Sequence, residues 1–261
     1  MQIQTENRTT FPRPFRALGC AECRNAKVLG FDFTMAFQLI LDVPQQRPFA
    51  YEALVRGTRG EGAREVLERV NENNRYRFDQ ACRVKAIEQA TQLGLLDIPD
   101  CLLSINFLPN AVYRAETCIR ATLEAATRFG FPQERVMFEV TEGEQIHDAD
   151  HLKRIFAEYN KQGFTTAIDD FGAGYSGLNL LAEFQPDILK LDMALTRGID
   201  RDAVRQAIVA GIVLVAQRLG IRIVAEGIET AGERDALLDL GVRYMQGYFF
   251  ARPQIDRLCL P

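Results

Sequence analysis

The chain has 261 residues, of which 47% are hydrophobic, and it carries a formal net charge of −4. This size and composition fit one large α/β domain better than two small ones. The acidic balance, with no basic stripe, argues against a polynucleotide partner. The longest apolar stretch, 207–216, is too short to cross a bilayer core of roughly 30 Å, and the polar start MQIQTENRTT is unlike a signal peptide. We therefore expect a cytoplasmic protein without membrane contact.

The N-terminal part of the chain predicts an arm followed by a β-hairpin. Residues 1–28 are irregular in pattern and contain Pro12 and Pro14, so we expect an arm or tail there and a single barrel domain over 29–261. The run 31–41 (FDFTMAFQLIL) alternates with a period of two, as in a strand. A turn, DVPQQRP, and a second apolar run, FAYEALV, complete the predicted antiparallel pair.

Strand and helix patterns alternate along the rest of the chain. Helical patterns over 115–130, 148–163 and 200–220 each end at a glycine, the usual C-terminal stop. The expected strands are 101–107, 135–142, 165–171, 187–192, 221–227 and 247–251. Parallel strands that alternate with helices, plus one antiparallel entry strand, predict an α/β fold of the TIM-like (β/α)8 barrel type with one antiparallel strand. A doubly wound open sheet is the structural alternative.

A glycine motif near the middle of the chain suggests a dinucleotide fingerprint. Residues 172–177 read Gly-Ala-Gly-Tyr-Ser-Gly, and Asp192 follows about 20 residues later. Asp169 and Asp170, however, directly precede these glycines, and a bound pyrophosphate would lie against their carboxylates. We therefore interpret the glycines as a turn that lets the Asp pair face a metal site.

Polar residues recur at or near the C-terminal ends of the expected strands. They are Glu52, Asn106, Glu139, Asp169, Asp170, Lys190, Glu226 and, just before the last expected strand, Gln246. Each alone is more typical of a cap or a solvated loop, but in a barrel all these strand ends meet at one mouth. Five carboxylates against one lysine would repel each other without one or two divalent cations. Oxygen ligands without His or Cys favour Mg²⁺ or Mn²⁺ over Zn²⁺.

Two short motifs have weaker metal-ligand spacing. Cys20 and Cys23 form a C-x-x-C, but a second such pair is missing from the sequence, so we favour an ordinary N-terminal segment. His147 and His151 lie four residues apart at an expected helix start, where capping by a neighbouring Asp is favoured over metal binding.

Seven motifs in a fixed order resemble the EAL-domain cyclic di-GMP phosphodiesterases of bacteria. They are YEALVRG, SINFLPN, FEVTEGEQI, AIDDFGAGYSGLNLL, ILKLDMAL, VAEGIET and QGYFFARP, and together they cover about Phe33 to Pro253. The chain departs from most of the family in having no Trp after the EAL arginine, where it reads GTRGEGAREVLERV, and in having Gly-Ala-Gly for Gly-Thr-Gly. The first departure resembles EAL domains that accompany blue-light sensor modules.

The resemblance implies a function and a role for each site residue. It implies hydrolysis of cyclic di-GMP to linear pGpG by a water activated between two Mg²⁺ or Mn²⁺ ions, with Lys190 and Glu226 as catalytic residues beside the ligand Glu52. The implied metal ligands are Glu52, Asn106, Glu139, Asp169 and Asp170. The implied substrate contacts are Leu54, Arg56, Asp192, Gly227, Glu229 and Gln246, and Glu142 would anchor the DDFGAG loop.

The resemblance also implies a homodimer formed by helices beside the barrel, for which 207–216 is a candidate, although a buried barrel helix gives the same apolar pattern. It also allows a separate sensor or regulatory protein as a partner. Two other functions stay open at this point. One is a non-catalytic EAL module that binds cyclic di-GMP or a protein, although every ligand position is filled. The other is an unrelated metal-dependent barrel or an NAD enzyme.

Overall fold

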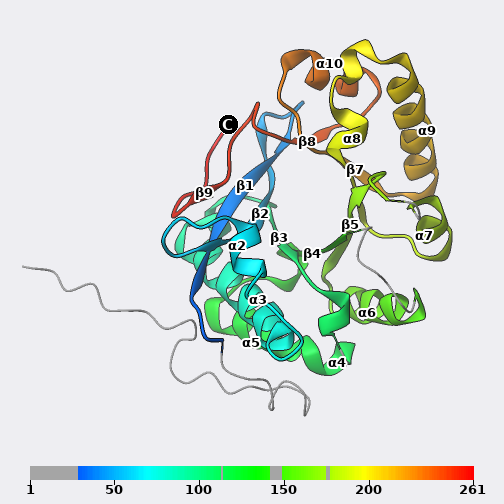
Figure 1. Ribbon diagram of the computed structural model, residues 1–261. Helices are drawn as coiled ribbons and strands as arrows, with labels where there is room; N and C mark the ends of the chain where they lie inside the picture. The colour runs from blue at the N-terminus through cyan, green and yellow to red at the C-terminus, as the bar shows by residue number, and fades with distance from the viewer. Residues whose placement is uncertain (1–28, 113, 142–148, 175–176) are drawn as a thin grey trace, which may run out of the picture.

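A closed ring of eight strands forms the centre of the protein (Figure 1). The computed structural model describes residues 29–112, 114–141, 149–174 and 177–261. The ring strands are β1 (Phe33–Asp42), β2 (Arg47–Gly57), β3 (Leu102–Asn106), β4 (Val136–Thr141), β5 (Thr165–Phe171), β6 (Ile188–Leu191), β7 (Arg222–Ala225) and β8 (Tyr244–Gln246). Strands β2 to β8 are parallel, and β1 closes the ring by antiparallel pairing with β2 and β8. A short strand, β9 (Gln254–Ile255), pairs with β1 outside the ring.

This topology confirms the predicted TIM-like barrel with one antiparallel strand and is incompatible with an open sheet. The expected strand over 165–171 matches β5, and the expected hairpin matches β1 and β2. The expected arm over 1–28, with Cys20 and Cys23, lies outside the described residues, as do Glu142 and His147.

Helices cover the outside of the ring (Figure 1). The α-helices are α2 (Ala63–Leu67), α3 (Arg75–Gln92), α4 (Ala115–Cys118), α5 (Arg120–Phe129), α6 (Ala149–Lys161), α7 (Gly177–Glu183), α8 (Met193–Thr196), α9 (Ala203–Leu219) and α10 (Ala231–Asp239). Short 3-10 turns are η1 (Leu95–Asp97), η2 (Pro109–Ala111), η3 (Gln133–Arg135) and η4 (Ile199–Arg201). The carboxylate of Asp202 caps α9 by accepting from two backbone N–H groups, and α5 and α9 end at Gly130 and Gly220 with φ of 64° and 73°. No helix in the described ranges is both long and apolar enough to span a membrane.

The outer face of the ring packs against the helices. In β1 the alternate residues Phe33, Met35, Phe37 and Leu39 belong to the main hydrophobic core, as the period of two predicts. Each is at most 2% exposed. Full burial of one such side chain contributes about 1.5–3 kcal/mol, so this face is a major source of the stability of the ring.

The inner face of the ring has an apolar layer below a polar one. Seven strands contribute one residue each to a separate buried cluster, which is Ile40, Ala50, Leu102, Met137, Ala167, Ile188 and Val224. Two positions further toward the mouth come Gln38, Glu52, Ser104, Glu139, Asp169, Lys190 and, directly after β7, Glu226. Since side chains two apart in a strand share a face, the apolar cluster is a floor on which the polar residues stand.

The last ring strand lies earlier in the chain than we expected. Residues 247–251 were predicted to be a strand that Gln246 precedes, but Gln246 is the final residue of β8 and a turn follows it. The N–H of Ile228 donates to Gln246 O and the N–H of Phe249 donates to Ile228 O, so the chain bends around Ile228. Residues 247–251 are rich in aromatic side chains but therefore do not form a strand, because their backbone N–H groups make their hydrogen bonds within this bend.

A substitution at Gly247 tests the packing of this bend against Ile228. A Cβ built on Gly247 would overlap the backbone N and O of Ile228, whereas one on Gly30 would meet open space. We expect Gly247→Ala to lower the free energy of unfolding by about 1–3 kcal/mol and Gly30→Ala to change it by less than about 0.5 kcal/mol, as measured by urea denaturation. Equal stability of the two variants would contradict this packing.

Candidate functional site

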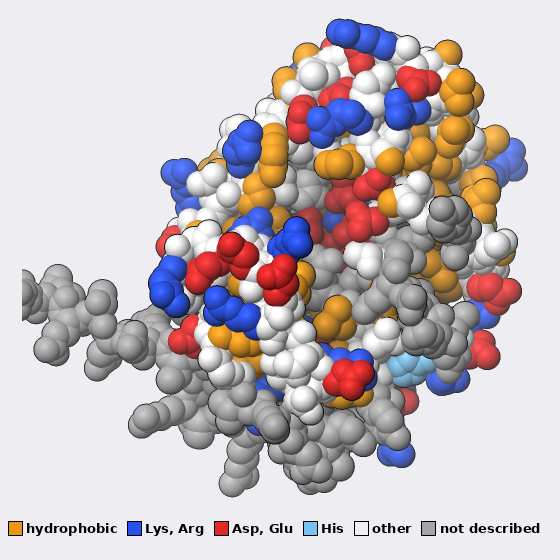
Figure 2. Space-filling model, in the orientation of Figure 1, with side chains coloured by type: hydrophobic (Ala, Val, Ile, Leu, Met, Phe, Trp, Pro, Cys, Tyr) orange, Lys and Arg blue, Asp and Glu red, His pale blue; other side chains and the backbone are white. Residues whose placement is uncertain are grey.

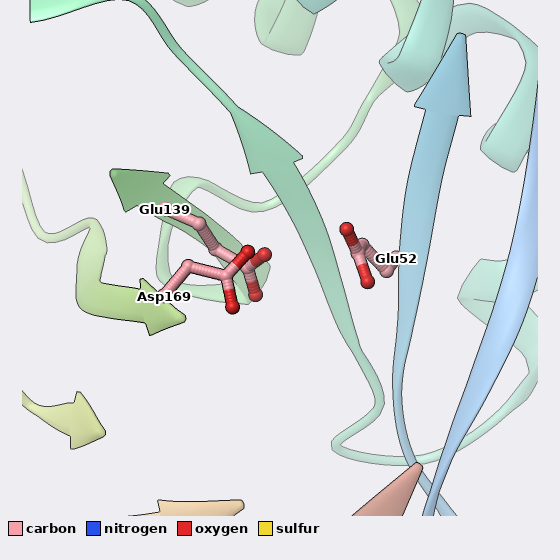
Figure 3. Close-up of side chains that lie close together, drawn as sticks. All are labelled: Glu52, Glu139 and Asp169. Carbon is pink, nitrogen blue, oxygen red and sulfur yellow. The ribbon is translucent and has the colours of Figure 1, made fainter. Parts of the chain in front are cut away.

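Side chains from successive strands meet at the C-terminal mouth of the ring. Glu52 from β2, Glu139 from β4 and Asp169 from β5 are buried, and their carboxylates point toward one another (Figure 3). The rest of the predicted constellation lies around them: Asn106 at the end of β3, Asp170 in β5, Lys190 in β6, Glu226 directly after β7 and Gln246 at the end of β8. The structure thus brings all eight predicted residues together. Figure 2 shows acidic side chains gathered in a hollow of the surface.

Lys190 is at the centre of this cluster. Its side chain is 0% exposed, and its Nζ lies 2.8 Å from Glu226, 2.9 Å from Glu139, 3.0 Å from Asp169 and 3.4 Å from Glu52. Burial opposes the charged form of Lys190, but the surrounding carboxylates outweigh it and hold its pKa well above the usual value. Lys190 is therefore a permanent cation that four carboxylates share.

Two amides orient the carboxylate of Glu52. Asn106 Nδ2 donates to Oε1 over 2.9 Å, and Gln246 Nε2 donates to Oε2 over 2.7 Å. Both Glu52 oxygens are thus fixed by side chains from β3 and β8. Such bonds hold the carboxylate in one orientation at low entropic cost, as a binding site for a cation requires.

The cluster has more negative charge than Lys190 balances. Burial raises the pKa of Glu139 to about 8, and Glu52 and Asp169 add to the rise while Lys190 opposes it. Burial also raises the pKa of Asp170 to about 6, with repulsion from Asp169 as the next cause. The pKa of Glu226 lies well above its usual value because of burial, which Lys190 only partly offsets. Additional positive charge would therefore stabilise the ionised cluster.

The backbone of β5 bends so that two neighbouring aspartates serve one site. Neighbouring residues in a regular strand point to opposite faces. Asp170, however, has φ of 55°, and the pairing of β5 with β6 is irregular between Ile168 and Phe171. The N–H of Asp170 donates to Asp169 Oδ1 over 3.0 Å. A positive φ in a residue other than glycine is strained, which is typical of functional sites.

The oxygen atoms of the cluster fit divalent cations. Ligand oxygens of Glu52, Glu139 and Asp169 lie within 4.8 Å of one another, as do those of Asp169, Asp170 and Glu226. Asp169 belongs to both groups. Oε1 of Glu139 is buried without a hydrogen-bond partner, so this oxygen is available to a cation. Carboxylate oxygens without His or Cys suit Mg²⁺, Mn²⁺ or Ca²⁺.

A cavity of about 370 Å³ opens beside the cluster. Four predicted substrate residues line it, namely Asp192, Gly227, Glu229 and Gln246. Gly227 has φ of 69°, and a Cβ there would meet the Met193 side chain at 2.6 Å, so only glycine fits this wall. Gly227 thus lies in the cavity wall, and its contact with any ligand stays a prediction.

Other residues of this wall were absent from the sequence-based prediction. They are Gln38, Met193, Arg197, Gly247 and Tyr248. Gln38 had a signal, since it is the one amide in the apolar run of β1. Arg197 forms an ion pair with Glu229 at 2.6 Å. The two residues are far apart in the chain, so the sequence alone does not show that they meet.

Two predicted substrate residues lie elsewhere. Leu54 lines a second, mostly apolar cavity of about 320 Å³, which it shares with Asn106 and Phe107. Arg56 donates from Nη1 to the backbone O of Val55 and is not among the lining residues of either cavity. Their roles as substrate contacts stay predictions. His151, from the second His motif, has its Nε2 2.7 Å from Val112 O and is not among the lining residues of either cavity.

The mouth is where TIM-like barrels carry their active sites, and carboxylates gathered there from successive strands are suited to hold divalent cations. The EAL domain family model matches residues 22–253, and the chain belongs to this family. The sequence resemblance to this family is thereby confirmed.

Solved structures and curated relatives agree with the match to the EAL family. The crystal structure of a standalone versatile EAL protein from Vibrio cholerae O395, in its c-di-GMP-bound form, has 54% identity and a TM-score of 0.85, covering 89% of this chain and 96% of that one. BlrP1 of Klebsiella pneumoniae, in a manganese/cy-diGMP complex, has 37% identity and a TM-score of 0.81, covering 88% and 58%. Cyclic di-GMP phosphodiesterase RocR of Pseudomonas aeruginosa is 39% identical over 131 residues, 50% of this chain and 33% of RocR.

The chain spans about half the length, or less, of the curated relatives that it matches. It is 28% identical over 221 residues to the blue light- and temperature-regulated antirepressor BluF of Escherichia coli, which is 85% of this chain and 54% of BluF. This relative accords with the predicted likeness to EAL domains of blue-light proteins. Relatives of the chain thus include cyclic di-GMP phosphodiesterases, and the similar BlrP1 structure is a complex with manganese and cyclic di-GMP.

The charge balance of the cluster gives a stability prediction. Lys190→Met leaves buried carboxylates without their shared cation, so we expect the free energy of unfolding in metal-free buffer to fall by about 3–5 kcal/mol. Lys153→Met removes an ion pair with Glu183 on the surface and should cost less than about 1 kcal/mol. Urea denaturation measures both. A Lys190→Met variant as stable as wild type would show that the carboxylates are neutral.

Proposed function

We propose that the protein is a metal-dependent phosphodiesterase that hydrolyses cyclic di-GMP to linear pGpG and so ends a second-messenger signal. The observation that carries the proposal is the buried ring of carboxylates around Lys190, at the mouth of a barrel that is 54% identical to a c-di-GMP-bound EAL protein. Water adds to one phosphorus, the P–O3′ bond breaks, and the 3′-oxygen leaves with a proton.

Divalent cations make the acidic mouth compatible with an anionic substrate. Carboxylates alone would repel the two phosphates of a cyclic dinucleotide. The proposed ligands of two Mg²⁺ or Mn²⁺ ions are Glu52, Asn106, Glu139, Asp169 and Asp170, and the two overlapping carboxylate groups support a count of two. When bound, such ions supply Lewis-acid stabilisation of the phosphoryl oxygens and a nucleophile at neutral pH.

Lys190 and Glu226 are the proposed catalytic residues that act on the attacking water. The ammonium of Lys190 donates hydrogen bonds into the centre of the cluster, where it orients the attacking water and offsets charge. Glu226 lies 2.8 Å from Lys190 Nζ and also lines the cavity, so its carboxylate reaches both the water and the substrate side. Its carboxylate is the proposed proton acceptor for the attacking water.

The cavity wall is the proposed substrate site. Asp192 and Glu229 offer carboxylate acceptors that match the N–H donors of a guanine edge. Gln246 and Gly227 lie between them and the cluster, and Gln246 contacts Glu52 directly. Arg56 is the proposed phosphate contact and Leu54 an apolar one, on the rim formed by the end of β2. Glu142 is the proposed anchor of the DDFGAG loop.

Removal of one ligand tests this function. Glu52→Ala should reduce kcat/KM for cyclic di-GMP with Mn²⁺ by roughly 100-fold or more, since a bound ion contributes several kcal/mol to the transition state. Glu65→Ala, a change on the exposed surface of α2, is the matched control and should keep wild-type activity. Nucleotide chromatography with and without EDTA measures the product. Undiminished activity in EDTA contradicts the proposal, and tight binding without turnover under several metals supports the non-catalytic alternative.

We also propose the setting in which the enzyme acts. Residues 29–261 form the catalytic barrel and 1–28 an arm, and the site of action is the cytoplasm. Among the described residues, Cys82 and Cys101 are buried and form no disulfide, as is typical of a reducing compartment. A separate sensor or regulatory protein is a proposed partner, since the similar BluF is regulated by blue light and temperature.

A homodimer through α9 is part of the proposal. Val204, Ile208, Val215 and Leu219 are between 38% and 69% exposed, and their spacing places them on one face of the helix. Figure 2 shows hydrophobic side chains along the edge of the molecule that α9 forms in Figure 1. An exposed apolar face of this kind is typical of an association surface.

The dimer is tested at that face. We expect Ile208→Glu to convert a dimer into a monomer in analytical ultracentrifugation, because a charge in an apolar interface is costly to desolvate. Arg218→Glu, an exposed change on the same helix that keeps the apolar residues, is the control. A wild-type chain that stays monomeric at high micromolar concentration contradicts this part of the proposal.

A further inference from the structure

A buried ion pair lies outside the ring, behind β3 and β4. Asp79 and Arg83 are one turn apart on α3, with Nη2 of Arg83 2.8 Å from Oδ2 of Asp79. Their side chains are 3% and 0% exposed. Desolvation of such a pair is costly, and hydrophobic residues in its place are often equally stable or more stable. The pair therefore calls for an explanation other than stability.

The second oxygen of Asp79 holds the chain that follows Asn106. Leu108 N–H donates to Asp79 Oδ1 over 3.0 Å. Phe107, which lies between Asn106 and Leu108 in the chain, donates its N–H to the backbone O of Glu139 over 3.0 Å. The end of β3 is thus tied to α3 on one side and to β4 on the other, within two residues of Asn106.

Arg83 occupies an aromatic cage that flanks two proposed metal ligands. Its guanidinium carbon lies 5.5 Å from the ring centroid of Phe107, 5.0 Å from that of Phe138 and 5.7 Å from that of Tyr159. Nη1 also donates to the hydroxyl of Tyr159 over 2.8 Å. Cation–π contacts at buried sites are stronger than those at the surface, so the cage fixes all three rings.

The cage and the proposed metal ligands lie on opposite faces of the same strand ends. Phe107 follows Asn106 in the chain and Phe138 precedes Glu139. Since neighbouring residues of a strand point to opposite faces, the rings point out to Arg83 while the amide and the carboxylate point into the mouth. The positions of these rings therefore constrain the backbone that carries Asn106 and Glu139.

We propose that Asp79 and Arg83 are positioning residues, which hold Asn106 and Glu139 in the orientation that binds the divalent cation. This inference rests on the proposed function, because it assumes that these two side chains are metal ligands. The ion pair touches neither the cation nor the substrate and acts through Leu108, Phe107 and Phe138. Groups of this kind, one step behind the ligands, typically change metal affinity or activity by 10- to 100-fold.

Metal affinity, measured by calorimetry with Mn²⁺ and the full chain, is the test. We expect Asp79→Ala to weaken Mn²⁺ binding by roughly tenfold or more, because Leu108 and Arg83 both lose their partner. Asp42→Ala is the matched control. Asp42 is a carboxylate 3% exposed that pairs with Arg243 at the opposite end of the ring, so its loss should leave Mn²⁺ affinity unchanged. KM for cyclic di-GMP should stay constant in Asp79→Ala while kcat falls.

A second variant covers a failure of Asp79→Ala to fold. Tyr159→Phe removes only the hydroxyl that Arg83 binds and should weaken Mn²⁺ binding by a few-fold. If wild type binds Mn²⁺ and neither variant binds it more weakly than the Asp42→Ala control does, this inference is overturned and the proposed function stands. A wild-type chain that binds no Mn²⁺ would overturn the proposed function, and the inference with it.

Discussion

The burial of Lys190 among four carboxylates is the constraint on which the rest of the site depends. An ammonium with no exposed surface is tolerated only because Glu52, Glu139, Asp169 and Glu226 surround it within 3.4 Å. Burial in this arrangement raises the pKa of Glu139 to about 8, and the negative charges of Glu52 and Asp169 add to the rise. Further cations would stabilise the ionised form of this site. Charge balance thus links the fold to the proposed metal-dependent chemistry.

The barrel makes this arrangement possible by layering. An apolar floor fills the narrow part of the ring, and the polar residues lie two positions closer to the mouth on the same strands. The floor keeps water from the base of the cluster, so the electrostatic interactions above it are strong. Departures from regular strand geometry occur where the site needs them, at Asp170 with its positive φ and at Gly227 against Met193.

Sequence patterns predicted the parts that depend on periodicity. The period of two in β1, the glycine stops of α5 and α9 and the polar residues at strand ends were sufficient for the barrel and for the eight clustered residues. The strand expected over 247–251 was wrong, because its backbone bonds to Ile228 and this contact is not visible in sequence. Arg197 and the Asp79–Arg83 pair were missed for the same reason: each acts through residues far away in the chain.

Anomalous diffraction from crystals soaked with Mn²⁺ tests the central claim, that divalent cations balance the acidic mouth. The account predicts two anomalous peaks in the mouth, with Asp169 a ligand of both and Glu52, Asn106, Glu139 and Asp170 completing the two sites. Such peaks would place the cations where the pKa of Glu139 and the unpartnered oxygen Oε1 indicate a need for positive charge. A mouth without anomalous density at saturating Mn²⁺, or with Mn²⁺ bound only elsewhere, would contradict the account.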